Sequence, residues 1–381
     1  MSKLSNVSCY VTEKISVDNI DISEYITTDN LLQNKRGRVI AEKLPTQKVT
    51  KFKKDDILIA NIRPYLKKIW QADIDGGASS DVLVVRPNNL IDNNFLYYAL
   101  TQDSFFEYVM KGSKGTKMPR GDKIQIMNFV IPDLEIGEQI KIGKLLKSID
   151  QKIQINDQIN QELEAMAKTL YDYWFVQFDF PDQNGKPYKS SGGKMVYHPE
   201  LKREIPEGWG VESVGNLLDK VTKAEKIENN SIEFVGRIPV IDQSQKYIAG
   251  FTNNQNSLIQ PQNGHVIFGD HTRVVKFINF DYARGADGTQ VLISNNENIS
   301  NILLYHMIED FDLSNYGYAR HFKFLKEKLV IVPDKKISLQ FANKADVIYK
   351  KIRNNIFENQ ELTQLRDWLL PMLMNGQVKV E

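Results

Sequence analysis

The tetrapeptide NQEL occurs twice in this chain, at 160–163 and at 359–362, and the residues around it correspond as well. The segment INDQINQELEAMAKTL (155–170) aligns with NNIFENQELTQLRDWLL (354–370) at a constant offset of 199. In a chain of 381 residues a four-letter match is expected by chance, so the evidence for a repeat lies in the flanking residues.

Further matches extend the correspondence toward the N-terminus, and the offset drifts only from 199 to about 208. A few loop deletions between corresponding elements account for such a drift. The sequence therefore predicts two copies of one unit, each a mixed segment followed by a long helix. The matching pairs are FVIPD (129–133) with VIVPD (330–334), FLYYAL (95–100) with ILLYHMI (302–308), GGASSDVLVV (76–85) with RGADGTQVLIS (284–294), and DILIANIRP (56–64) with HVIFGDHTR (265–273).

The mixed segment of each copy has the pattern of an α+β domain. Short β-branched or alternating runs, bounded by Gly, Asp and Asn, predict strands at ILIANI, DVLVVRP, VIFGD and QVLIS. A short amphipathic helix is expected near 93–108 in the first copy and near 300–310 in the second.

The helical segments carry an apolar seam with the three- and four-residue spacing of a coiled coil. Eight of ten seam positions are apolar in the first helix and seven of ten in the second, where Arg366 departs from the pattern. The two sets, related by 199, are Ile142, Leu146, Ile149, Ile153, Asn156, Asn160, Leu163, Ala167, Leu170 and Trp174, and Phe341, Ala345, Ile348, Ile352, Asn355, Asn359, Leu362, Arg366, Leu369 and Leu373.

Both seams hold asparagines at the same two places, Asn156 with Asn160 and Asn355 with Asn359. Seam asparagines weaken packing but penalise slipped registers, because a slip leaves an amide buried without a partner. Two matched helices in one chain are expected to pair with each other, antiparallel, with these asparagines setting the register. There are two alternatives to this pairing. Each helix could pack on its own domain, or the helices could form a coiled coil between two copies of the chain.

Composition places the chain among ordinary globular proteins, with 41% hydrophobic and 25% charged residues. No apolar run approaches the ~20 residues that span a membrane, and the N-terminal residues lack the apolar core of a signal peptide. The single cysteine, Cys9, excludes an internal disulfide framework. A cytoplasmic protein without membrane contact is expected.

Motifs for catalysis are missing from the sequence. Neither G-x-G-x-x-G after a strand nor G-x-x-x-x-G-K-[ST] occurs, and the N-P-P-[FY] type of motif found in amino-methyltransferases is also absent. The five histidines and Cys9 do not have a metal-ligand spacing. The sequence therefore predicts no catalytic residues, no metal and no cofactor of its own.

Three features resemble the DNA-specificity subunit of type I restriction–modification enzymes. The stretch IPDLEIGEQIKIGKLLKSIDQKIQINDQINQELEAMAKTLYDYWF (131–175) is similar to the first conserved region of that family. The stretch FDFPDQNGKPYKSSGGKMVYHPELKREIPEGW (178–209) is similar to its linker into a second recognition domain. The third feature is the order of domain, helix, domain, helix.

This resemblance implies two target recognition domains, 1–133 and 209–334, spacer helices 134–177 and 335–381, and a linker 178–208. Each domain would read one half of a bipartite site in double-stranded DNA, with the paired helices fixing the gap. It also implies two methyltransferase subunits that bring S-adenosylmethionine, and restriction or translocase subunits that use ATP and Mg. A coiled-coil DNA-binding scaffold or repressor without such partners is the alternative, and an enzyme with an unrecognised motif is another.

The net charge of +1 gives no overall preference for nucleic acid, so DNA contacts are expected from local basic loops. Lysines are expected to contact phosphates, whereas arginine and amide side chains read base edges. Arg63 and Arg273 occupy matching places after a strand, and the loops GTKMPR and GYARH match before the long helices. The candidates are Arg36, Arg38, Arg63, Tyr65, Lys67, Lys68, Lys114, Lys117 and Arg120 in the first copy, and His271, Arg273, Lys276, Arg284, Tyr316, Tyr318, Arg320, His321 and Lys323 in the second. Trp174 and Trp368 are expected to be exposed on the helices for core or partner contacts.

Overall fold

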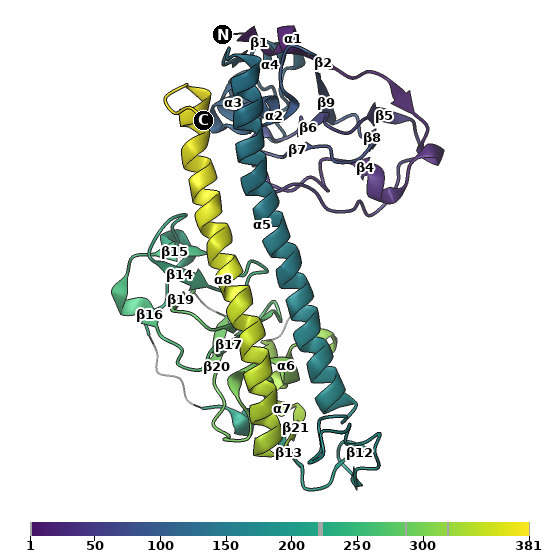
Figure 1. Ribbon diagram of the computed structural model, residues 1–381, viewed down its shortest axis with the longest axis vertical. Helices are drawn as coiled ribbons and strands as arrows, with labels where there is room; N and C mark the ends of the chain where they lie inside the picture. Colours follow the sequence, from purple (N-terminus) through teal and green to yellow (C-terminus); the bar gives the residue numbers. More distant parts are fainter. Residues whose placement is uncertain (1, 220–223, 286–287, 318–319, 381) are drawn as a thin grey trace. The chain divides into compact units, whose positions relative to one another are not determined.

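The computed structural model describes residues 2–219, 224–285, 288–317 and 320–380. The chain forms two compact units. The first comprises residues 1–155 together with 358–381, and the second comprises residues 156–357 (Figure 1). Each unit therefore contains part of both long helices, α5 (Ile136–Tyr171) and α8 (Lys335–Met374).

The first unit contains two four-stranded sheets. One has the order β2-β9-β6-β7, all antiparallel, and the other has the order β3-β5-β8-β4, in which β4 and β8 are parallel. The helices α2 (Asn93–Thr101) and α3 (Asp103–Lys111) follow β9. The strands are β2 (Ser8–Tyr10), β3 (Lys14–Ile15), β4 (Tyr25–Ile26), β5 (Val49–Phe52), β6 (Ile57–Ala60), β7 (Ile69–Gln71), β8 (Gly76–Ala78) and β9 (Val82–Pro87).

The second unit repeats this arrangement. A three-stranded antiparallel sheet has the order β18-β17-β20, and a four-stranded sheet has the order β15-β14-β19-β16, in which β14 and β19 are parallel. The strands are β14 (Ile238–Ile241), β15 (Gly250–Thr252), β16 (Leu258–Ile259), β17 (His265–Gly269), β18 (Val275–Ile278), β19 (Tyr282–Arg284) and β20 (Thr289–Leu292), and the helix α6 (Asn301–Ile308) follows β20.

The equivalence between the units extends to individual pairings. The central strand β6 lies between β7 and β9, as β17 lies between β18 and β20. The chain enters and leaves each domain through one antiparallel pair, which is β1 (Ser2–Lys3) with β10 (Val130–Ile131) in the first unit and β13 (Gly210–Ser213) with β21 (Leu329–Val332) in the second. The four strands predicted from β-branched runs correspond to β6, β9, β17 and β20. The α+β fold with an internal repeat is therefore confirmed.

Expected and observed helices differ at two places. The helix expected near 93–108 is divided at Gln102, whose extended backbone (ψ 146°) ends α2 and begins α3. The helix α5 continues into a π-helical turn, Asp172–Val176, which directs Trp174 and Phe175 into the core of the second unit. Trp174 is only 3% exposed, so its expected exposure is wrong, whereas Trp368 is 57% exposed.

The core of each unit is built from both long helices. In the first unit, Ile142 and Leu146 of α5 share a cluster with Leu370 and Leu373 of α8. In the second unit, Ala167 near the end of α5 shares a cluster with residues from the first half of α8, among them Phe341, Ala345 and Ile352. The predicted seam positions are all buried or half-buried. The two helices thus pack antiparallel within each unit, the early part of one against the late part of the other.

Polar residues mark defined layers of this seam. In the second unit Asn355 Nδ2 donates to Asn160 Oδ1 at 2.8 Å, and the pair is buried, with Asn355 fully enclosed. In the first unit Asn359 Nδ2 donates to the carbonyl of Ile153 at 3.4 Å. The antiparallel register thus pairs Asn160, the first residue of the first NQEL, with Asn355, which lies four residues before the second NQEL.

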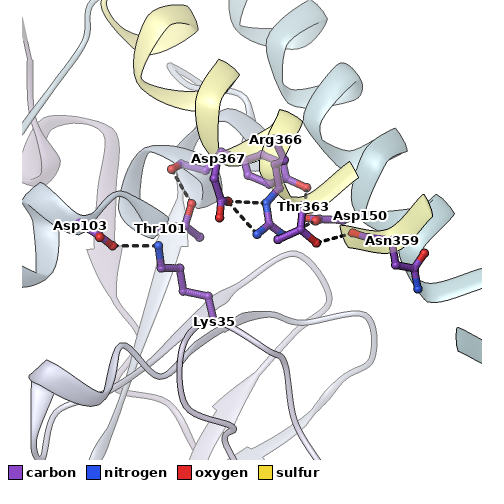
Figure 2. Close-up of polar contacts among 9 residues, drawn as sticks. Lys35, Thr101, Asp103, Asp150, Asn359, Thr363, Arg366 and Asp367 are labelled. Atoms are coloured by element: carbon purple, nitrogen blue, oxygen red, sulfur yellow. Dashed lines mark hydrogen bonds and ion pairs between the residues drawn. The ribbon is translucent and has the colours of Figure 1, made fainter. Parts of the chain in front are cut away.

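Arg366, the departure from the apolar seam, is held by an ion pair in the first unit. Its guanidinium contacts Asp150 Oδ1 at 2.7 Å (Figure 2). Tyr98 donates its hydroxyl to Asp150 Oδ2 at 2.7 Å. Burial lowers the pKa of Arg366, but the carboxylates of Asp150 and Asp367 outweigh this effect and raise it overall. This contact connects α2, α5 and α8 within one unit.

The segment 178–208, expected as a linker, is folded within the second unit. It contains the hairpin β11 (Met195–His198) and β12 (Arg203–Pro206), and Phe178, Phe180 and Ile205 lie in the core with Trp209. Phe180 stacks on Trp209 with ring centroids 4.8 Å apart. Among the residues that the structure describes, no helix has an apolar stretch long enough to cross a membrane.

We predict that Asn355→Leu alone lowers the free energy of unfolding by about 1–3 kcal/mol, because Asn160 is left buried without its partner. Replacing both asparagines by leucine should recover that loss, since no unpaired amide remains. Urea denaturation of the two single variants and the double variant forms a double-mutant cycle that measures the coupling.

The control is Asn354→Leu, one position away on the exposed side of α8, where a change within about 0.5 kcal/mol is expected. A single Asn355→Leu variant as stable as the double variant contradicts the pairing.

Candidate nucleic-acid interface

In the first unit, the loop after the central strand β6 is joined to two other loops by backbone hydrogen bonds. Asn61, directly after β6, donates its amide to the carbonyl of Asp81 in the β8–β9 loop at 2.8 Å. Its carbonyl accepts from Gly121, just before α4 (Lys123–Met127), at 3.1 Å. Arg63 donates to the carbonyl of Pro119 at 2.8 Å. Asn61 is thus the meeting point of three loops.

The second unit has the same junction at the equivalent place. Asp270, directly after β17, donates its amide to the carbonyl of Gly288 in the β19–β20 segment at 2.7 Å. Its carbonyl accepts from His321, at the start of α7 (His321–Glu327), at 2.9 Å. The side chain of Asp270 also accepts from the amide of Phe322 at 2.8 Å. These bonds align Asn61 with Asp270, Asp81 with Gly288, and Gly121 with His321.

A fourth loop packs on this junction in both units. In the first unit, Asn34 and Lys35 donate to the carbonyls of Leu66 and Lys67, each at 2.9 Å. In the second unit, the loop after β14 contributes Gln243, whose carbonyl accepts from the Thr272 hydroxyl at 2.6 Å. Four loops therefore meet around the end of the central strand in each copy. Such loop clusters on a rigid sheet are where binding residues are commonly found.

An arginine in the left-handed conformation lies at each junction. Arg63 has φ 52° and Arg273 has φ 63°, values that few residues other than glycine adopt. Such a backbone costs on the order of 1–3 kcal/mol and is concentrated at functional sites. Arg63 and Arg273 were predicted to occupy matching places after a strand. Both follow the central strand, but the junction aligns Arg63 with Thr272 and Pro64 with Arg273, so the two arginines share a backbone conformation one position apart.

In the first unit the predicted DNA-binding residues fall into two groups. Arg36, Tyr65, Lys114 and Lys117 are exposed, and Arg120 is exposed but lies 3.2 Å from Asp81. The remaining side chains are half-buried. Lys67 pairs with Asp103 at 2.9 Å, and Arg63 is half-buried, with its Nε atom enclosed.

Two further candidates of the first unit have structural partners. Arg38 donates to the carbonyl of Ser23 at 2.7 Å and lies over the ring of Trp70. Lys68 donates to the carbonyl of Thr28, and burial lowers its pKa. These contacts anchor the 27–38 loop, so Arg38 and Lys68 are better explained as loop anchors than as DNA contacts.

In the second unit, three predicted residues line one hollow of about 410 Å³. His271 follows the junction residue Asp270, Arg284 ends β19, and Arg320 precedes α7. The lining also includes five residues that the sequence reasoning missed, namely Lys226, Asp270, Gly288, Thr289 and Gln290. Loop polarity alone did not distinguish them, although Gln290 begins the predicted strand QVLIS and Thr289 directly precedes it.

The other predicted residues of the second unit are spread around this hollow or lie inside the protein. Arg273 and Lys323 are exposed, and Tyr316 stacks on Phe324. Lys276 is only 4% exposed and donates to the carbonyl of Asp242 at 2.8 Å, and burial lowers its pKa to about 8. His321 is also 4% exposed, with Nδ1 3.0 Å from the Asp270 carbonyl. Burial therefore removes Lys276 and His321 from the surface candidates, and Tyr318 lies outside the described residues.

The described parts of the chain contain no group of three or more His, Cys, Asp or Glu side chains placed to hold a metal ion. The chemistry offered by the two junctions is hydrogen-bond donation from arginine, lysine and amide groups. Donors of this kind read base edges and contact phosphates.

Comparison with known proteins also points to DNA recognition. A family model described as a type I restriction modification DNA specificity domain matches residues 8–165. The specificity subunit of the HindI type I restriction enzyme of Haemophilus influenzae is 23% identical over 98% of this chain and 98% of its own length. The MjaIX specificity subunit of Methanocaldococcus jannaschii is 25% identical over 77% of this chain and 71% of its own length.

Among solved structures, a type I restriction–modification S subunit from M. genitalium has the same fold. It matches with a TM-score of 0.61 and 15% identity, over 98% of this chain and 95% of that one. The family match covers the first copy of the repeat, and the HindI relative covers both copies. Residues 8–165 therefore match the DNA specificity domain of type I restriction–modification enzymes, and the chain as a whole is similar to specificity subunits of these enzymes.

Proposed function

We propose that this chain selects the DNA target of a type I restriction–modification complex by reading a bipartite site in double-stranded DNA. The observation that carries the proposal is the repeated four-loop junction. Both units hold the same loops in the same backbone frame, yet Asn61, Asp81 and Gly121 of the first unit correspond to Asp270, Gly288 and His321 of the second. A shared frame with different side chains suits two half-sites of different sequence.

In this proposal the chain has no catalytic residues and no cofactor of its own. Two methyltransferase subunits supply S-adenosylmethionine and modify the DNA, and restriction or translocase subunits use ATP and Mg. Internal pseudosymmetry suits a partner present in two copies, because each repeat offers an equivalent surface. The paired helices α5 and α8 set the length of the gap between the half-sites.

The decisive experiment maps methylated bases in the genome of cells with and without the gene. One bipartite motif should lose its methylation when the gene is deleted and regain it on complementation. The purified chain alone should methylate no DNA until methyltransferase subunits are added. Methylation that is unchanged by the deletion favours a coiled-coil repressor or scaffold, and methylation by the isolated chain identifies an enzyme.

We predict that Arg63→Ala relaxes or abolishes recognition in one half-site only. Arg63 lies at the junction of the first unit, and removal of a base-reading arginine typically costs about 1–3 kcal/mol of discrimination. The methylated motif of cells carrying the variant gives the readout. The unaltered half-site serves as the internal control for folding, and an unchanged motif removes Arg63 from the reading residues.

We further predict that seven residues inserted at facing positions of both α5 and α8 lengthen the gap of the motif. The insertion adds about 10 Å of helix, which corresponds to about 3 base pairs of duplex. The half-sites themselves should stay the same. Insertion into α5 alone is the matched control, because it offsets the seams and should abolish methylation. A motif that keeps its original gap after the paired insertion contradicts a spacing role for the helices.

A further inference from the structure

The hollow of the second unit is lined by two arginines together with the Asp270 carboxylate. Arg284 and Arg320 both line it, from the end of β19 and from the residue before α7. In the described parts of the chain, neither guanidinium has an ion pair or a side-chain hydrogen bond. Arginines that fold back on the surface usually find such a partner, as Arg120 does with Asp81 at 3.2 Å in the first unit.

The pseudosymmetry explains why this charge is confined to one unit. The junction bonds align Arg320 with Arg120, and they align Gly288 with Asp81. The parallel pairs β14–β19 and β4–β8 align Arg284 with Ala78, because Ile241 faces Arg284 as Ile26 faces Ala78. Relative to the first unit, the second therefore gains a cation at Arg284 and has Gly288 in place of Asp81, the carboxylate that pairs with Arg120.

A second observation marks the hollow as incomplete without a ligand. The Thr289 side chain lines it and is 4% exposed, and its hydroxyl has no hydrogen-bond partner in the described structure. A buried hydroxyl left unsatisfied costs on the order of 1–3 kcal/mol. A ligand with hydrogen-bonding groups that enters the hollow would remove this cost. The Asp270 carboxylate also lines the hollow, and its Oδ1 accepts from the Phe322 amide.

The donor-rich lining restricts which base edge fits. Guanine is the base that presents two neighbouring acceptors, N7 and O6, in the major groove without a donor beside them. Adenine adds an amino donor, cytosine presents a donor, and thymine combines one acceptor with a methyl group. In the minor groove guanine offers a donor, which two guanidinium groups do not match, whereas A·T pairs present only the acceptors adenine N3 and thymine O2. Contact with that edge would make the relaxed position an A·T pair and not a guanine.

We propose that Arg284 and Arg320 determine specificity by reading a guanine, through its O6 and N7 atoms, in the half-site of the second unit. The proposal rests on the proposed function, since it names the base class that one recognition unit takes. The first unit, with Ala78 and a neutralised Arg120, does not read its half-site in this way.

The first test maps the methylated motif in cells whose chain carries Arg284→Ala or Arg320→Ala. One guanine position in one half-site should become degenerate, with discrimination falling roughly tenfold or more, while the other half-site stays unchanged. Arg237→Ala is the matched control, because Arg237 is an exposed arginine of the same unit at the start of β14, the opposite end of that strand from the hollow. Relaxation at a position that is not guanine, relaxation in both half-sites, or an unchanged motif overturns the proposal.

The second test uses the unaltered complex with its methyltransferase subunits, so it does not depend on how the variants fold. Oligonucleotides carry 7-deazaguanine, which lacks N7, at one guanine at a time. One substitution in the half-site of the second unit should lower the affinity roughly tenfold. Inosine at the same position keeps N7 and O6 and should bind like guanine.

Phosphate contact gives a different result and would overturn the proposal. In that case 7-deazaguanine has no effect at any position of the half-site of the second unit, and Arg284→Ala lowers affinity equally for all sequences while reducing its salt dependence. The proposed function fails separately, because it requires loss of the whole methylated motif when the gene is deleted. A motif that depends on the gene but has no guanine in this half-site disproves only the guanine assignment.

Discussion

The packing of α5 against α8 within each unit is the constraint on which the remaining structure depends. Neither repeat encloses its core with its own helix alone. The first unit needs Leu370 and Leu373 from the end of the chain to cover Ile142 and Leu146, and the second needs Ala167 and Trp174 from the middle of the chain. The helices α5 and α8 must therefore pair in one register. The buried Asn160–Asn355 hydrogen bond favours this register over slipped registers.

A common backbone frame carrying different side chains is the second organising feature. The junctions are held by main-chain bonds at Asn61 and at Asp270, and these bonds do not depend on the side chains presented to the outside. The second unit has Arg284 where the first has Ala78, and Gly288 where the first has Asp81. These differences change the charge at the junction without changing the strands. A recognition unit built in this way can alter what it binds while it preserves its fold.

Most of the fold could be predicted from the sequence because two signals indicate the repeat. One is the similarity of the aligned segments, and the other is the spacing of apolar residues in the two long helices. The strands around Ile57 and Val266 and the seam asparagines were found in this way. The candidate interface was predicted less well. Local charge placed Lys276 and Arg38 among surface contacts, but Lys276 is enclosed by backbone carbonyls and Arg38 is anchored on Trp70 and Ser23. A long cationic side chain in a loop can fold inward as readily as outward, and loop sequences do not encode the difference locally.

The sequence by itself determined the duplication, the class of fold and the antiparallel helical seam, since each follows from periodicity and order along the chain. Tertiary structure alone decided which helix halves complete which core, that Arg366 finds Asp150 and Tyr98, and that Arg284, Arg320 and Thr289 meet in one hollow. The physical reason is that these contacts join residues far apart in sequence. Their partners are chosen by strand pairing and loop geometry, and neither leaves a local pattern in the chain.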